Sequence, residues 1–114
     1  MSGTYVSAAS VEEAVGAMAA GARPVAGGTD LVVGSRQGKS PLPDSIVAIH
    51  RIAELGGVSG SGGGLRLGAL VTHEELVDHP VVRERFTALA DASAIVGSHA
   101  TRAQGTIGGN VMNA

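Results

Sequence analysis

Two glycine-rich stretches hold the residues of this sequence that are best suited to grip a ligand. The first runs from Val25 to Leu31 around the pair Gly27-Gly28, and the second runs from Gly105 to Asn113 around Gly108-Gly109. Glycine lets the backbone approach a ligand closely, and consecutive N–H groups can then converge on a phosphate. We therefore predict one extended anionic ligand that the main chain holds at two points.

Each stretch taken alone also fits an ordinary tight turn beside a strand. The first is not the dinucleotide fingerprint G-x-G-x-x-G, because its glycine pair is followed by five residues before Gly34. Hydroxyls at Thr29 and Thr106 and the amide of Asn110 favour a ligand when both stretches are considered together. Asp30 would repel an anion, so we expect it to cap a following helix or to turn away.

Other site chemistries find little support. The 4 histidines match no zinc pattern, and no pair of them is spaced i, i+4 on one helix. The serines lack the G-x-S-x-G elbow of a hydrolase. We expect His73 to be exposed after a helix cap, and His99 to lie on a surface loop from which it could approach a ligand. The sequence thus predicts no catalytic residue and no metal site.

Composition sets further limits. The chain has 114 residues, 44% of them hydrophobic, with one Tyr, one Phe and 18 glycines, so its core is thin and a cofactor, partner or further residues should help it fold. The absence of cysteine excludes disulfides and Fe–S ligation by this chain. With a net charge of −2, the chain lacks the excess of basic residues that is typical of nucleic-acid-binding proteins. No signal peptide or membrane-spanning run is evident, which favours a cytoplasmic location.

Local patterns predict the elements that would position the glycine stretches. Ser10 and Glu13 have capping-box spacing, and Val11, Val15, Met18 and Ala19 should form the buried face of the helix that follows. We expect strands at 4–6, 23–26 and 46–49, a hairpin of 56–59 and 65–68 around the Gly60–Gly64 run, and helices opening near Asp30, at Thr72, at Pro80 and at Arg85. Residues 37–45 and 98–102 are expected to be loops.

Three stretches together carry a resemblance to a known family. They are Ala26 to Leu31, Leu67 to Leu76, and Arg102 to Asn113 with its Gly-Thr-Ile-Gly-Gly-Asn core. In this order they resemble the FAD-binding subunit or domain of molybdenum hydroxylases, a group that includes xanthine dehydrogenase and the medium subunit of carbon monoxide dehydrogenase. The resemblance covers essentially the whole chain. One departure is Ala103-Gln104 after Arg102, where relatives often carry an Arg-Asn pair.

The resemblance implies an α+β fold of the FAD-binding PCMH type, which is the vanillyl-alcohol-oxidase-like fold. Residues 1–55 would be the N-terminal βαβ subdomain and residues 56–114 the first part of a second subdomain, so the chain would be an N-terminal fragment. The implied FAD-binding residues are Ala26, Gly27, Gly28, Thr29, Asp30, Leu31, Gly97, Thr106, Gly109, Asn110 and Asn113.

The implied function is that of a component of a molybdopterin-dependent oxidoreductase. Electrons would pass from [2Fe–2S] clusters through FAD to NAD⁺, a quinone or oxygen, and the partners would be a molybdopterin-binding large subunit and a [2Fe–2S] small subunit. The chain alone would be inactive. Two alternatives remain: another flavoprotein of the same fold, against which the Thr72 to Leu76 motif argues, and an assembly module that does not bind flavin alone.

Overall fold

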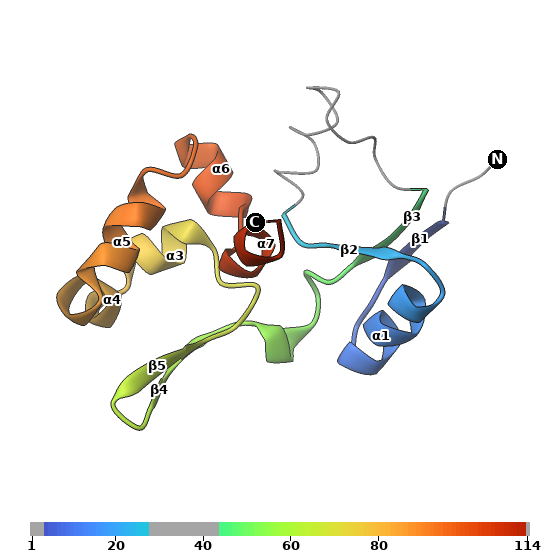
Figure 1. Ribbon diagram of the computed structural model, residues 1–114, viewed down its shortest axis with the longest axis horizontal. Helices are drawn as coiled ribbons and strands as arrows, with labels where there is room; N and C mark the ends of the chain where they lie inside the picture. Colours follow the sequence, from blue (N-terminus) through green and yellow to red (C-terminus); the bar gives the residue numbers. More distant parts are fainter. Residues whose placement is uncertain (1–3, 28–43, 114) are drawn as a thin grey trace.

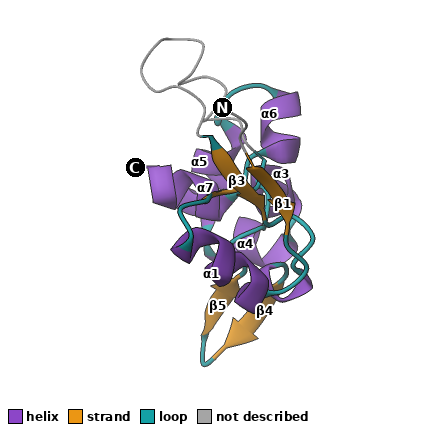
Figure 2. Cartoon of the chain, turned by 90° about the vertical axis from the view of Figure 1, so that its right-hand side faces the viewer, coloured by secondary structure: helices purple, strands orange, loops and turns teal. Residues whose placement is uncertain are grey.

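A small parallel sheet organises the first half of the molecule. The computed structural model describes residues 4–27 and 44–113. Strands β1 (Thr4–Ser7), β2 (Arg23–Val25) and β3 (Ser45–Ala48) form a three-stranded sheet in the order β1-β3-β2, with both outer strands parallel to β3. Helix α1 (Val11–Ala19) lies against this sheet (Figure 1, Figure 2). The three predicted strands are confirmed.

The central position of β3 explains its apolar sequence. Val47 and Ala48 are buried, and Val47 faces Val6 of β1 and Pro24 of β2 in the register. Proline has no N–H to donate, so it is tolerated on the edge strand β2 and would not suit the centre of a sheet.

The ends of α1 follow directly from local sequence. The Ser10 hydroxyl accepts a hydrogen bond from the Glu13 N–H (3.1 Å), while the Glu13 carboxylate accepts one from the Ala9 N–H (3.0 Å). At the other end Gly21 has φ of +105°, and the Ala22 N–H reaches back to the Ala17 carbonyl. This left-handed glycine ending is the Schellman motif, and the predicted helix start at Ser10 is confirmed.

The predicted buried face of α1 is confirmed in part, at Val11, and is wrong at Val15, Met18 and Ala19. Ala14 is buried, and Val11 and Ala17 pack beside it against the sheet, whereas Val15 is 57% exposed and Met18 is 43% exposed. Ala19 is exposed as well. A face of small residues lets the helix lie close to the strands. The prediction favoured the larger side chains of Val15 and Met18, because alanine gives a weaker signal of burial in the sequence.

A β-hairpin leads into the second half of the chain. A short 3₁₀ turn, η1 (Ala53–Leu55), precedes β4 (Val58–Ser61) and β5 (Gly64–Leu67), which pair antiparallel. Gly62 and Gly63 both have positive φ, as a type I′ turn requires. The predicted hairpin is confirmed, and its glycine run serves the turn.

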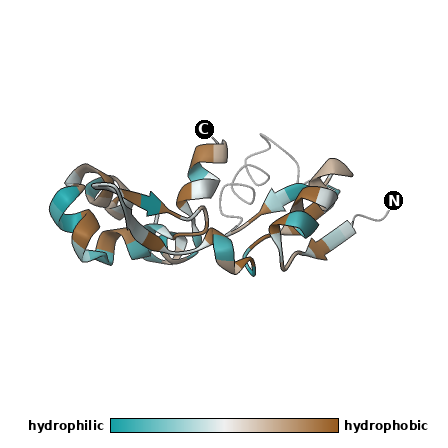
Figure 3. Ribbon diagram, turned by 90° about the horizontal axis from the view of Figure 1, so that it is seen from below, coloured by the Kyte–Doolittle hydropathy of each residue, from teal (hydrophilic) through white to brown (hydrophobic). Residues whose placement is uncertain are grey.

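Helices make up the rest of the described structure. They are α3 (His73–Asp78), α4 (Pro80–Arg85), α5 (Thr87–Ala94), α6 (His99–Gln104) and α7 (Ile107–Asn113). Polar and apolar bands alternate along these helices (Figure 3). The apolar residues gather in a second buried cluster of Val71, Leu76, Val82 and Ala90, distinct from the first cluster of Ala8, Ala14, Val47 and Ile52. The mixed helix and strand content agrees with the predicted α+β class.

Two of these helices differ from the prediction. The segment expected as a polar loop after Gly97 is α6, because the Ser98 hydroxyl caps the Thr101 N–H (3.2 Å) and starts a helix. The second glycine pair is also helical, since Gly108 and Gly109 lie in the first turn of α7. The helix expected near Asp30 and most of the loop expected at 37–45 fall outside the described residues.

None of the helices in the described part of the chain is long and apolar enough to cross a membrane.

Candidate functional site

The two glycine stretches meet in space. Gly27 follows β2 directly, and its α-carbon lies so close to Gln104 that a Cβ added at Gly27 would overlap the Gln104 carbonyl oxygen. Gln104 is the last residue of α6 and immediately precedes the second stretch. Close approach of two backbones is one of the uses of glycine. The structure therefore brings together segments that are distant in the sequence.

Main-chain pairing fixes the second stretch against the segment before α3. Thr72 and Thr106 form an antiparallel bridge, and the His73 N–H donates to the Gly105 carbonyl (3.1 Å). On the other side of the bridge the Ile107 N–H donates to the Val71 carbonyl (2.9 Å). This short ladder holds Thr106 in place, and Thr106 is only 6% exposed.

A pocket of about 290 Å³ opens where the two stretches meet. Its described lining consists of Ala26, Gly27, His50, Leu70, Thr72, Gln104 and Thr106. These described residues combine backbone, hydroxyl, amide and imidazole groups with two apolar side chains, those of Ala26 and Leu70, and none of them carries a carboxylate. Such a mixture suits a polar or anionic ligand.

Three main-chain N–H groups around the second glycine pair already donate hydrogen bonds within the protein. The Gly108 N–H donates to the Ala69 carbonyl, the Gly109 N–H to the Thr106 hydroxyl (3.0 Å), and the Asn110 N–H to the Thr106 carbonyl. The hydroxyl thus caps α7. These three N–H groups already have partners, whereas no hydrogen bond of the Thr106 N–H is found among the described residues, so the predicted main-chain grip at this stretch stays a prediction. The Thr106 hydroxyl can still donate its own proton to a ligand.

The predicted ligand-binding residues divide into three groups. Ala26, Gly27 and Thr106 line the pocket. Gly97, Gly109 and Asn110 do not line it; Gly97 lies three residues past the end of α5 with a φ of +49°, and its carbonyl accepts a hydrogen bond from the Arg102 side chain. Gly28, Thr29, Asp30 and Leu31 lie outside the described residues, as does the side chain of Asn113.

His73 and His99 differ in exposure. His73 is 4% exposed, so the expectation of an exposed side chain is wrong, and both of its ring nitrogens lack a partner among the described residues. It is the first residue of α3, and its backbone N–H pairs with the Gly105 carbonyl. His99 is exposed, with its Nε2 atom 3.7 Å from the Glu74 carboxylate. Within the described ranges no three His, Asp or Glu side chains could hold a metal.

Sequence reasoning did not identify His50, Leu70, Thr72 and Gln104, which also line the pocket. His50 follows a buried strand, and Thr72 looked like a helix cap only. The capping role of Thr72 is confirmed, since its hydroxyl accepts from the Glu75 N–H (3.2 Å). A usable signal was available for His50, because side chains just past the carboxyl ends of parallel strands often meet a ligand.

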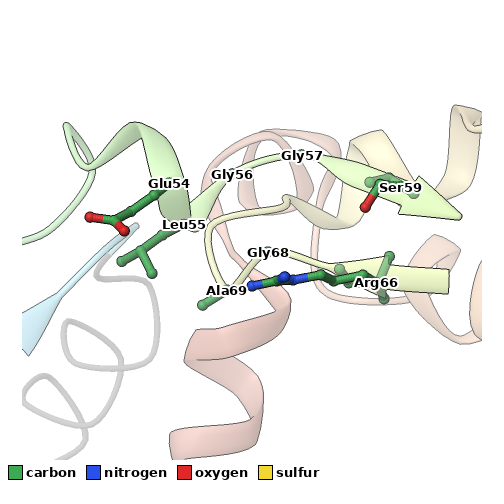
Figure 4. Close-up of a pocket in the computed structure, with 10 residues that line it drawn as sticks. Glu54, Leu55, Gly56, Gly57, Ser59, Arg66, Gly68 and Ala69 are labelled. Carbon is green, nitrogen blue, oxygen red and sulfur yellow. The ribbon is translucent and has the colours of Figure 1, made fainter. Parts of the chain in front are cut away.

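A second cavity lies beside the base of the hairpin. It has a volume of about 450 Å³ and is lined by residues 54–59 and 66–69 (Figure 4). Glu54 and Arg66 supply its charged side chains, and the glycines Gly56, Gly57 and Gly68 expose main chain between them. Neither glycine stretch contributes to this cavity, so it is separate from the site described above.

Comparisons with known proteins agree with this geometry. The family described as the FAD binding domain in molybdopterin dehydrogenase matches residues 1–114. The carbon monoxide dehydrogenase medium chain of Hydrogenophaga pseudoflava is 32% identical over 110 residues, which cover 94% of this chain and 38% of that protein. The nicotinate dehydrogenase FAD-subunit of Eubacterium barkeri is 37% identical over 87 residues, covering 76% of this chain and 29% of that protein.

Solved structures of related enzymes superpose on this chain as well. A carbon monoxide dehydrogenase structure from Hydrogenophaga pseudoflava superposes with a TM-score of 0.87 at 30% identity, covering 97% of this chain and 39% of that one. Quinoline 2-oxidoreductase from Pseudomonas putida 86 superposes with a TM-score of 0.84 at 32% identity, covering 96% of this chain and 39% of that one. The chain belongs to the FAD-binding family of the molybdopterin dehydrogenases. It spans about two fifths or less of the length of these relatives.

The cofactor of this family is FAD, and the pocket fits part of it. The described part of the lining carries no carboxylate and includes a glycine that begins a glycine pair, and both features are compatible with a pyrophosphate. Complete ligand pockets are typically about 300–1,000 Å³, so a pocket of about 290 Å³ holds a portion of a dinucleotide.

Proposed function

We propose that this chain forms the first part of the FAD site of a molybdopterin-dependent oxidoreductase. The single observation that carries the proposal is the pocket in which Ala26 and Gly27 meet Thr106. Bound FAD supplies the electron-carrying chemistry, and the protein supplies binding and orientation. No side chain of this chain is assigned an acid–base or nucleophilic role.

Gly27, Thr106 and Leu70 have distinct tasks in the proposed site. Gly27 brings the backbone after β2 close to the ligand and to Gln104. Thr106 directs its hydroxyl proton toward the ligand while its oxygen keeps the cap of α7. Leu70 contributes the apolar part of the lining and excludes water. We also propose Gly28, Thr29, Asp30, Leu31, Gly97, Gly109, Asn110 and Asn113 as cofactor contacts, on the family resemblance.

Beyond the site, the proposal extends to the whole protein. The fold would be of the FAD-binding PCMH type, with subdomains at residues 1–55 and 56–114; the two separate apolar clusters support this boundary. Electrons would reach FAD from [2Fe–2S] clusters of a small subunit, after substrate hydroxylation on a molybdopterin-binding large subunit. Relatives named as medium chains or FAD-subunits support this arrangement. The chain alone would show no dehydrogenase activity.

Titration with FAD tests the proposal in the natural polypeptide that contains residues 1–114. We expect saturable binding of one FAD per chain, followed by flavin fluorescence. Replacement Thr106→Val should weaken binding by about tenfold, the usual effect of one lost hydrogen bond to a charged group. Thr106→Ser keeps the hydroxyl and should stay within about threefold of the wild type.

Thermal unfolding of the same variants separates binding from folding. A lower melting temperature for Thr106→Val with unchanged FAD affinity would show that Thr106 only caps α7. A wild-type protein that binds no FAD would overturn the proposed function and would favour an assembly module.

A further inference from the structure

We propose that His50 is a cofactor-contacting residue of this site and that its imidazole donates a hydrogen bond to a phosphate oxygen of FAD. The inference rests on the proposed function, and it assigns a side chain that neither glycine stretch contains. His50 lines the pocket together with Ala26, Gly27 and Thr106.

Strand pairing brings His50 to the first glycine stretch. Strands β2 and β3 are parallel and adjacent, with Val25 opposite Ala48 in the register. The Ile49 N–H then donates to the Val25 carbonyl (3.0 Å), which extends the pairing one step past β3. The next residues on each side are Ala26 and His50, so both leave the sheet at the same edge. Ligands of parallel α/β sheets bind outside this carboxyl edge.

The charge of the lining favours His50 as the contact to an anion. Among the described residues that line the pocket, His50 alone has a side chain that can become positively charged. The Thr72 hydroxyl is already bonded to the Glu75 carboxylate (3.2 Å), and the Thr106 hydroxyl oxygen accepts from Gly109. The ring of His50 has no hydrogen bond or ion pair to another described residue, so its N–H is available.

Position within the pocket favours the pyrophosphate over the rest of the cofactor. His50 lines the pocket together with Gly27, the first residue of the glycine pair, and phosphate groups are the usual ligands of glycine-rich segments. A hydrogen bond from imidazole to a phosphate oxygen is charge-assisted and therefore among the stronger ones. Because His50 is exposed, replacing it leaves the buried core unchanged.

Two substitutions in the natural polypeptide test the assignment. His50→Phe keeps a ring but removes the donor, whereas His50→Gln keeps an N–H donor. FAD affinity is measured by flavin fluorescence, and ADP affinity by displacement of FAD. We expect His50→Phe to weaken both ligands by about tenfold and His50→Gln to remain within about threefold of the wild type. Arg66→Gln, in the separate cavity of Figure 4, is the matched control and should change neither affinity.

The outcomes distinguish this inference from the proposed function. Failure of the wild type to bind FAD overturns the proposed function itself. Normal FAD binding by the wild type with unchanged affinity in His50→Phe overturns only the role of His50. Weaker binding of FAD with unchanged binding of ADP would place the imidazole away from the pyrophosphate and would overturn the phosphate contact.

Discussion

Gly27 controls how closely the two halves of the site approach. Its missing side chain is required by the protein itself, because a Cβ there would overlap the carbonyl of Gln104. The glycine therefore has a structural task in addition to any contact with FAD. Sequence reasoning assigned only the second task.

Replacement Gly27→Ala should destabilise the protein by about 1–3 kcal/mol, the usual range for overpacking a close contact. It should also weaken FAD binding, because Gln104 and the start of the second stretch must shift. Urea unfolding and FAD titration measure the two effects. Gly16→Ala is the matched control: a Cβ there meets nothing within 4 Å, and alanine in a helix should stabilise by about 0.5–1 kcal/mol. Equal stability of Gly27→Ala and wild type would contradict the close contact.

For single residues, sequence patterns predict local roles better than they predict whether a side chain is buried. Gly27 and Thr106 are identified by residue type and Ala26 by the family resemblance, and all three line one pocket. His73 was misjudged because a position just after a helix cap does not reveal burial, and the segment carrying His73 pairs with distant Gly105. His50 was missed for the same reason, since its neighbours come from strand pairing.

The residue that caps helix α3 also lines the pocket, so helix stability and ligand binding are connected there. Thr72 forms a full capping box with Glu75 and also lines the pocket, whereas Ser10 caps α1 away from it. Both caps accept a hydrogen bond from the third residue of their helix. Ser10 and Thr72 therefore form a matched pair of caps, of which only Thr72 lines the pocket.

Replacing either cap with alanine should cost about 1 kcal/mol of stability. Thr72→Ala should in addition weaken FAD binding, because it loosens the segment paired with Thr106. Ser10→Ala should leave FAD affinity unchanged. Thermal unfolding and FAD titration of both variants make the comparison; equal affinities in the two variants would separate Thr72 from the site.

Elements with strong local signals were predictable, and those fixed by distant contacts were not. Ser10, Thr72 and Pro80 marked helix starts correctly, and the positive-φ pair Gly62 and Gly63 closed the predicted hairpin. Helix α7 was missed because two glycines disfavour a helix by intrinsic propensity. Packing overrides that preference, since a Cβ at Gly108 would lie 2.6 Å from the Ala69 carbonyl oxygen.

At the scale of the molecule, two small apolar clusters flank the site. One lies around the parallel sheet and the other among helices α3 to α5 (Figure 1). The contact of Gly27 with Gln104 and the pocket beside it lie between the parts that carry these clusters. A ligand that touches both glycine stretches would therefore hold the two parts together. Binding to the folded state also raises stability by mass action.

Hydrogen exchange followed by mass spectrometry tests this account most directly. The natural polypeptide containing residues 1–114 is compared with and without saturating FAD. We predict slower exchange in peptides covering Ala26-Gly27 and Gly105-Thr106 together, with little change in the hairpin tip at Gly62-Gly63. Binding of FAD that slows exchange at only one glycine stretch, or at neither, would contradict a single site formed by both.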